Sequence, residues 1–182
     1  MGNALIIIDL QRDYFPGGKM ELSGIEDAAK NAKKLLKAFR EKKYALYHIQ
    51  HFSEYEGAAF FVPDTPGVDF NEAVLPLESE KVIKKNFPNS FRNTNLLEEL
   101  REAEIENLVL CGAMSHMCVD ATARAAFDFG FKCTVAGDAC ATRDLQYQNK
   151  TIAAEQVHGA FMAALFPVYA QLKNTEEILL SL

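Results

Sequence analysis

The chain has 182 residues, of which 49% are hydrophobic and 24% charged, and its formal net charge is −6. This length and composition predict one globular domain over residues 1–182, with a core that folds without disulfides. The negative charge argues against nucleic acid or an acidic membrane surface as a partner, because both are bound by a basic face. Four cysteines with no C-x-x-C pair argue against a disulfide framework and a zinc knuckle.

The first predicted element is a strand over residues 4–8, a short, uniformly apolar and mostly β-branched run. Such a run is typical of a strand buried on both faces of a parallel sheet. It is too short for a membrane helix, and it ends at Asp9 with no basic residue before it, unlike a signal peptide. We therefore expect a cytoplasmic protein with free thiols, no membrane partner and a buried first strand.

The rest of the chain alternates helices with strands. It predicts, in order, a helix over 25–42, a strand over 44–49, an irregular loop over 51–76, a strand over 81–83, a helix over 94–102, a strand over 107–111, an Ala-rich helix over 115–129, a strand over 132–136, a helix over 151–165, an edge strand over 168–172 and a short final helix from Thr175. This alternation predicts a three-layer α-β-α sandwich around a doubly wound parallel sheet of about six strands.

Reactive side chains follow three of the predicted strands. Asp9 follows the first strand, Lys84 and Lys85 follow the third, and Cys118 lies shortly after the fourth. Ligands of doubly wound sheets bind beyond the carboxyl ends of the strands, so a carboxylate, an ammonium and a thiol are expected to meet there. The thiol lies near a predicted helix start, where the macrodipole favours thiolate.

Each of these residues also has a structural interpretation. Asp9 can cap a loop, Lys85 can be a solvated lysine, and Cys118 can be a small core residue on a helix ridge. Core packing is the preferred interpretation for the other cysteines, which are Cys111, Cys133 and Cys140.

Four segments, taken in order, carry a family resemblance. They are residues 8–14, which match D-x-Q-x-D-F; residues 82–85 with 89–94, which match V-I-x-K…S-x-F…T; residues 110–125, which match G…C-V…T…A; and residues 137–139, which match a D-A turn. With this order and spacing, the chain resembles the isochorismatase-like cysteine hydrolases, a family that includes nicotinamidases, carbamoyl-group amidases and streptothricin hydrolase.

The resemblance implies a catalytic triad of Asp9, Lys85 and Cys118. Lys85 is preferred over Lys84 because its spacing to Phe91 is that of the family. The resemblance also implies a cis peptide bond between Ala113 and Met114, which would aim the N–H of Met114, with that of Cys118, at an oxyanion.

The implied activity is cleavage of a C–N bond in a small amide or carbamoyl compound through a Cys118 thioester. Asp9 would act as general base and then acid, and Lys85 as its electrostatic partner. Alternatives are an isochorismatase-type vinyl ether hydrolase and a catalytically silent oligomeric relative. A nucleotide-binding module is disfavoured, because residues 17–19 match no phosphate-binding loop.

No metal and no other cofactor is expected. Metal-dependent nicotinamidases carry Asp-x-His after the second strand, whereas Ile49 stands two residues before His51 here. His48 and His51 are three apart and would face opposite sides of a strand, so they cannot chelate together.

The predicted substrate contacts are Gln11, Tyr14, Phe61 and His116. For His116, a Cys–His base and a partly exposed residue at a helix start remain alternatives. The expected partners are a small amide-like substrate and further copies of the chain, in a dimer or tetramer.

Overall fold

The computed structural model describes residues 2–182. Its centre is a six-stranded sheet in the order β3-β2-β1-β4-β5-β8, and all of its neighbouring strands are parallel. The strands are β1 (Gly2–Ile8), β2 (Ala45–His51), β3 (Lys81–Lys85), β4 (Ile105–Ala113), β5 (Lys132–Ala141) and β8 (Gln171–Lys173). The predicted doubly wound parallel sheet is therefore confirmed.

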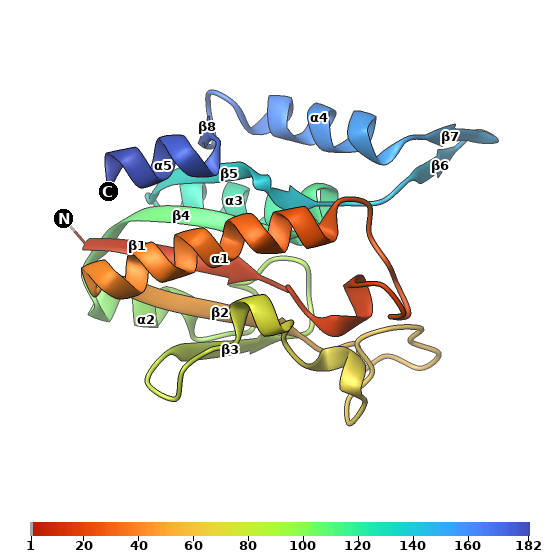
Figure 1. The fold of residues 1–182 in the computed structure, drawn as a ribbon, viewed down its shortest axis with the longest axis horizontal. Helices are drawn as coiled ribbons and strands as arrows, with labels where there is room; N and C mark the ends of the chain where they lie inside the picture. Colours follow the sequence, from red (N-terminus) through yellow and green to blue (C-terminus); the bar gives the residue numbers. More distant parts are fainter. Residues whose placement is uncertain (1) are drawn as a thin grey trace.

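Helices cover both faces of the sheet (Figure 1). They are α1 (Ile25–Lys42), α2 (Leu96–Glu102), α3 (Asp120–Asp128), α4 (Ala154–Leu165) and α5 (Thr175–Ser181). Helices α1 and α5 contribute to the hydrophobic cluster on one face, and α2, α3 and α4 contribute to the cluster on the other. Alternate residues of β1 enter these two clusters, with Ile7 in one and Ile6 and Ile8 in the other, which explains the uniformly apolar first strand.

Several segments differ from the prediction. The edge strand predicted over 168–172 is β8 at Gln171–Lys173, because the N–H groups of Tyr169 and Ala170 bond the Leu165 carbonyl in a turn. Residues 137–139, predicted as a turn, lie inside β5. Strand β5 continues to Ala141 rather than ending at 136, because a register shift near Gly112 lets β4 and β5 pair again further along. The helix predicted from Thr151 begins at Ala154, and a hairpin of β6 (Leu145–Tyr147) and β7 (Lys150–Ile152) precedes it. Gln148 and Asn149 form its turn with positive φ angles of 45° and 60°, as a two-residue hairpin turn requires.

Gly112 lets two central strands approach closely at their carboxyl ends. It pairs with Ile8 and has a φ angle of 125°, and a Cβ at this position would collide with the Ile8 carbonyl oxygen. Only glycine tolerates both the angle and the contact. The chain after β4 is thereby brought over the end of β1, where Asp9 lies.

Across residues 2–182, no helix combines the length and apolar character that crossing a bilayer demands.

Candidate active site

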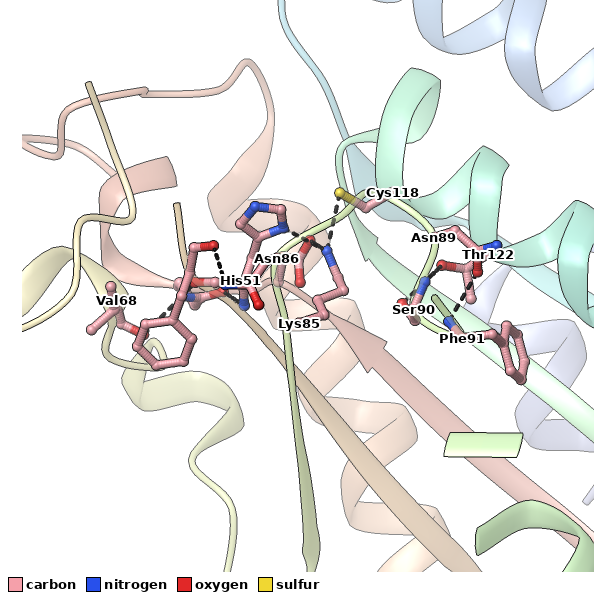
Figure 2. A network of polar contacts seen from close by, with 12 residues as sticks. His51, Val68, Lys85, Asn86, Asn89, Ser90, Phe91, Cys118 and Thr122 are labelled. Carbon is pink, nitrogen blue, oxygen red and sulfur yellow. Dashed lines mark hydrogen bonds and ion pairs between the residues drawn. The ribbon is translucent and has the colours of Figure 1, made fainter. Parts of the chain in front are cut away.

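The structure brings Asp9, Lys85 and Cys118 together at the carboxyl ends of the strands. Figure 2 shows Lys85 reaching toward the Cys118 sulfur. Asp9 follows β1 directly, with a strained φ of 52°, and Lys85 is the last residue of β3. Cys118 lies in a π-helical turn, Ser115–Val119, that links β4 to α3. All three side chains are buried, with exposed fractions of 0%, 1% and 4%.

The burial alternation along β3 decides between its two terminal lysines. Lys84 is exposed, whereas Lys85 points into the interior. The two residues face opposite sides of the strand, because side chains alternate with period two. The choice of Lys85 over Lys84 therefore agrees with the geometry.

The Lys85 ammonium is the centre of the site. Its Nζ lies 2.7 Å from Asp9 Oδ2, 2.8 Å from His51 Nδ1 and 3.3 Å from Cys118 Sγ. An ammonium has three N–H donors, so these three acceptors use all of them. The arrangement fixes the carboxylate, the imidazole and the sulfur around one positive charge.

His51 is the member of this cluster that sequence reasoning missed. It ends β2 and pairs with Lys85 in the parallel register. Burial and the Lys85 charge lower the pKa of His51 to about 4, against an opposing effect of Asp9, so the ring is neutral at physiological pH. The rule that found the other three, a polar side chain at the carboxyl end of a strand, applies equally to His51.

The sulfur of Cys118 is a thiol at neutral pH. Burial raises its pKa far above the usual range, the Asp9 charge adds to this, and Lys85 opposes it. Desolvation and the carboxylate therefore oppose the acidic sulfur that the ammonium and the helix start would favour. For Lys85, burial would lower the pKa, but the Asp9 carboxylate and the hydrogen bond to the Cys118 sulfur raise it overall.

Asp9 Oδ1 is available to accept a proton. It is buried without a hydrogen-bond partner among the described residues, whereas Oδ2 is held by Lys85. An oxygen of Asp9, the sulfur of Cys118 and a ring nitrogen of His51 lie within 4.8 Å of one another. The carboxylate is thus within reach of the thiol proton, directly or after a small side-chain movement.

A metal ion does not fit this cluster while Lys85 is present. Asp9, His51 and Cys118 offer a set of donor atoms for a cation, but the Lys85 ammonium already contacts all three. A metal at this centre would have to share it with the ammonium's positive charge. The absence of a metal remains a prediction, now based on this geometry.

Gln11 does not face a substrate. Its side-chain amide donates to the carbonyl oxygens of His51, at 2.9 Å, and Val68, at 2.8 Å, and its Oε1 accepts the N–H of His51 at 2.7 Å. Both amide hydrogens are used, and the side chain is completely buried. The predicted substrate contact is corrected to a clamp on the backbone of His51.

Phe61 is also a core residue. It is completely buried, its N–H donates to Asp13, and its ring packs 4.6 Å from the Tyr14 ring and 5.8 Å from the His51 ring. A fully buried phenylalanine cannot offer its surface to a ligand in this conformation. It instead packs against the rings of Tyr14 and His51.

Tyr14 lies beside the cluster, as predicted. Burial raises the pKa of its phenol, and the Asp9 carboxylate adds to this, as does Cys118 in its thiolate form. Its hydroxyl has no hydrogen-bond partner within residues 2–182, and the hydroxyl oxygen is not completely buried. A neutral hydroxyl therefore borders open space near the sulfur.

His116 is half-buried, and its contacts are with Thr142 and Phe161. Its Nδ1 is 2.6 Å from Thr142 Oγ1, and its ring packs against Phe161. Its pKa is lowered by burial and by Arg143. Within the described chain it makes no hydrogen bond to Cys118, so the geometry does not favour a Cys–His base.

The peptide bond between Ala113 and Met114 is cis, as the resemblance implies. The Met114 carbonyl accepts the N–H groups of Met117 and Val119 and closes the turn that carries Cys118. Below this turn, Thr122 Oγ1 accepts the Ser90 N–H at 3.1 Å and lies 2.8 Å from the Ser90 hydroxyl (Figure 2). The 89–94 motif therefore ties the segment after Lys85 to the helix after Cys118.

A doubly wound parallel sheet with a buried Asp–Lys–Cys site at its strand ends defines the structural class of the protein. Residues 3–165 match the family profile described as Isochorismatase domain, and the chain belongs to the isochorismatase family of hydrolases.

Proteins from several bacteria are similar to it. The uncharacterized isochorismatase family protein YddQ of Bacillus subtilis (strain 168) is 53% identical over 179 residues, which cover 98% of this chain and 99% of that one. The crystal structure of a putative isochorismatase hydrolase from Oleispira antarctica superposes with a TM-score of 0.95 at 43% identity, covering 98% and 96% of the two chains. A streptothricin hydrolase of Streptomyces noursei is 31% identical over 142 residues, 78% of this chain and 55% of that protein.

Proposed function

We propose that the protein is a cysteine hydrolase that cleaves an amide or carbamoyl C–N bond of a small molecule through a thioester on Cys118. The observation that carries this proposal is the Lys85 ammonium, which contacts both Asp9 and the Cys118 sulfur while one oxygen of Asp9 stays unpaired. The similarity to a streptothricin hydrolase supports hydrolysis of a small molecule.

The proton of the resting thiol moves during the attack. As the sulfur bonds to the substrate carbonyl carbon, Asp9 accepts the thiol proton, and the carbonyl π electrons move to oxygen. The ammonium of Lys85 lies beside both the departing proton and the sulfur, so it stabilises the charge that develops between them. A raised thiol pKa is compatible with this step, because no free thiolate has to accumulate.

The tetrahedral oxyanion would be held by the N–H groups of Met114 and Cys118, at the start of the turn that carries the nucleophile. Collapse of the intermediate breaks the C–N bond, and Asp9 returns its proton to the leaving nitrogen. Water then loses a proton to Asp9 and attacks the thioester, which releases the acid and restores the Cys118 thiol.

Replacement of the nucleophile tests the proposal. Cys118→Ala is expected to abolish hydrolysis across a panel of small amides, ureas and carbamoyl compounds, and Cys133→Ala, at another buried cysteine, serves as the matched control. Mass spectrometry of the acid-quenched wild-type protein should find an acyl adduct on Cys118. Full activity of Cys118→Ala would instead support a non-covalent, isochorismatase-type reaction, and an inactive wild type would support the silent relative.

The proposal includes a reducing, cytoplasmic environment and an oligomeric state. All four cysteines are free and buried, which suits a compartment where thiols stay reduced. Cell fractionation tests the location, and light scattering after size-exclusion chromatography tests the predicted dimer or tetramer.

A further inference from the structure

His51 has a fixed tautomer. Its Nδ1 faces the Lys85 ammonium at 2.8 Å, and an ammonium can only donate, so Nδ1 must be the acceptor. A neutral imidazole with an acceptor at one nitrogen carries its proton on the other. The Nε2 of His51 is therefore a hydrogen-bond donor in the resting protein.

This donor is free. The Nε2 atom makes no hydrogen bond within residues 2–182. It is not completely buried, so open space reaches it. The side chain is half-buried, and one of its ring nitrogens lies within 4.8 Å of the Cys118 sulfur. A group bound to Nε2 would lie within a short covalent chain of the carbon that the sulfur attacks.

The surroundings hold this donor rigidly. Gln11 bonds both the N–H and the carbonyl of the His51 backbone, and Phe61 packs against the ring. In Figure 2 the ring lies beside Lys85, joined to it through one nitrogen only. The imidazole is thus held by the Gln11 bonds to its backbone, by the Phe61 ring and by the Lys85 contact at Nδ1. Its Nε2 makes no hydrogen bond within the described residues.

Tyr14 supplies a second polar group on the same side of the site. Its ring and that of His51 both contact the Phe61 ring, and its phenol lies near enough to Asp9 for the carboxylate charge to raise its pKa. Tyr14 is only 2% exposed, yet its hydroxyl has no partner among the described residues. Because this hydroxyl has no partner in the described chain and borders open space, it can bond a ligand that enters the site.

We propose that His51 and Tyr14 determine specificity: the His51 Nε2–H and the Tyr14 hydroxyl bind a second hydrogen-bond acceptor of the substrate, a carbonyl-type oxygen on the acyl side of the scissile amide. This inference rests on the proposed function, because it assumes that the Cys118 sulfur marks the reacting carbon. Simple alkyl amides lack such an acceptor and would bind poorly, because they leave both donors unsatisfied.

The first test measures the tautomer directly. Histidine side-chain ¹⁵N NMR of the wild-type protein should find His51 neutral at pH 7 with its proton on Nε2. Assignment uses the signal lost in His51→Gln. A proton on Nδ1, or a charged ring at pH 7, would overturn the proposal without reference to any substrate.

The second test compares malonamide with butanamide, which replaces the second carboxamide by an ethyl group. Each ligand is used to protect Cys118 against alkylation by iodoacetamide, followed by peptide mapping. Malonamide should protect at a concentration at least about 3- to 10-fold lower than butanamide, the effect of one or two hydrogen bonds. Equal protection by the two ligands contradicts the inference.

Variants assign the effect to the two residues. His51→Phe and Tyr14→Phe should each reduce the preference for malonamide over butanamide by about 3- to 10-fold, whatever the change in the protection by butanamide itself. His51→Gln should recover part of the loss, because a carboxamide offers both an acceptor for Lys85 and a donor. Tyr47→Phe is the matched control, since the Tyr47 hydroxyl bonds the Glu99 carbonyl away from the site.

The two proposals fail separately. If Cys118→Ala remains active and no adduct forms, the thioester scheme fails whatever the protection data are. If the adduct forms but His51→Phe and Tyr14→Phe leave the ratio of malonamide to butanamide unchanged, the specificity assignment fails alone.

Discussion

Removing the Lys85 ammonium should destabilise the protein strongly, because it leaves a buried carboxylate without its partner. Lys85 Nζ and Asp9 Oδ2 are 2.7 Å apart, and both side chains are completely buried. Unit charges at this distance attract by about 6 kcal/mol at an effective dielectric constant of about 20. Desolvation offsets much of this, but one-sided removal of a buried partner still costs about 3–5 kcal/mol. Lys85→Met should therefore lower the free energy of unfolding by that amount at pH 8.

A double variant separates the lost charge pair from lost packing. Asp9→Asn together with Lys85→Met removes both charges, so the double variant should be more stable than Lys85→Met alone. Asn tolerates the positive φ of this position. Urea unfolding followed by circular dichroism suits the chain, which has no tryptophan. A loss below about 1 kcal/mol in Lys85→Met, or a double variant less stable than the single one, would refute a buried ion pair at the centre of the site.

Three further outcomes are expected. Lys85→Ala should create affinity for Co²⁺, seen as a sulfur-to-cobalt absorption band absent from the wild type, because it frees a carboxylate, an imidazole and a thiol within 4.8 Å of one another; a variant without this band would contradict the view that the ammonium fills the centre. Gly112→Ala should cost at least about 2 kcal/mol and most of the activity, because its φ of 125° and the collision with the Ile8 carbonyl both oppose a Cβ; wild-type stability would argue against this close approach. Burial is the main cause that lowers the pKa values of all four histidines, so the unfolded chain binds more protons than the folded one below pH 6.5. The free energy of unfolding should therefore fall as pH drops from 6.5 toward the folded pKa values, which for His51 is about 4, by at most about 1.4 kcal/mol per pH unit for each histidine. Urea midpoints should decrease over this range, and midpoints independent of pH would contradict this.

The sequence by itself determined the sheet and three members of the site. The apolar run of β1 requires burial on both faces, and the alternation of strands with helices then leaves few topologies. Their places after strands made Asp9, Lys84, Lys85 and Cys118 candidates, and the family resemblance carried by four motifs singled out Asp9, Lys85 and Cys118. These features depend on neighbours along the chain, which is why they can be read from the chain.

The tertiary structure decided the chemistry of the site. The role of His51 depends on Lys85, which lies 34 positions away in the chain. The raised pKa of the Cys118 thiol depends on burial and on the carboxylate of Asp9, which follows β1. The sequence predicted Gln11 and Phe61 as substrate contacts. In the folded protein, Gln11 bonds the His51 backbone and Phe61 packs against the His51 ring. The hairpin before α4 and the extension of β5 depend equally on partners that local patterns do not specify. Period and apolarity are local properties, whereas protonation, tautomer and hydrogen-bond partners are set by groups that only folding brings together.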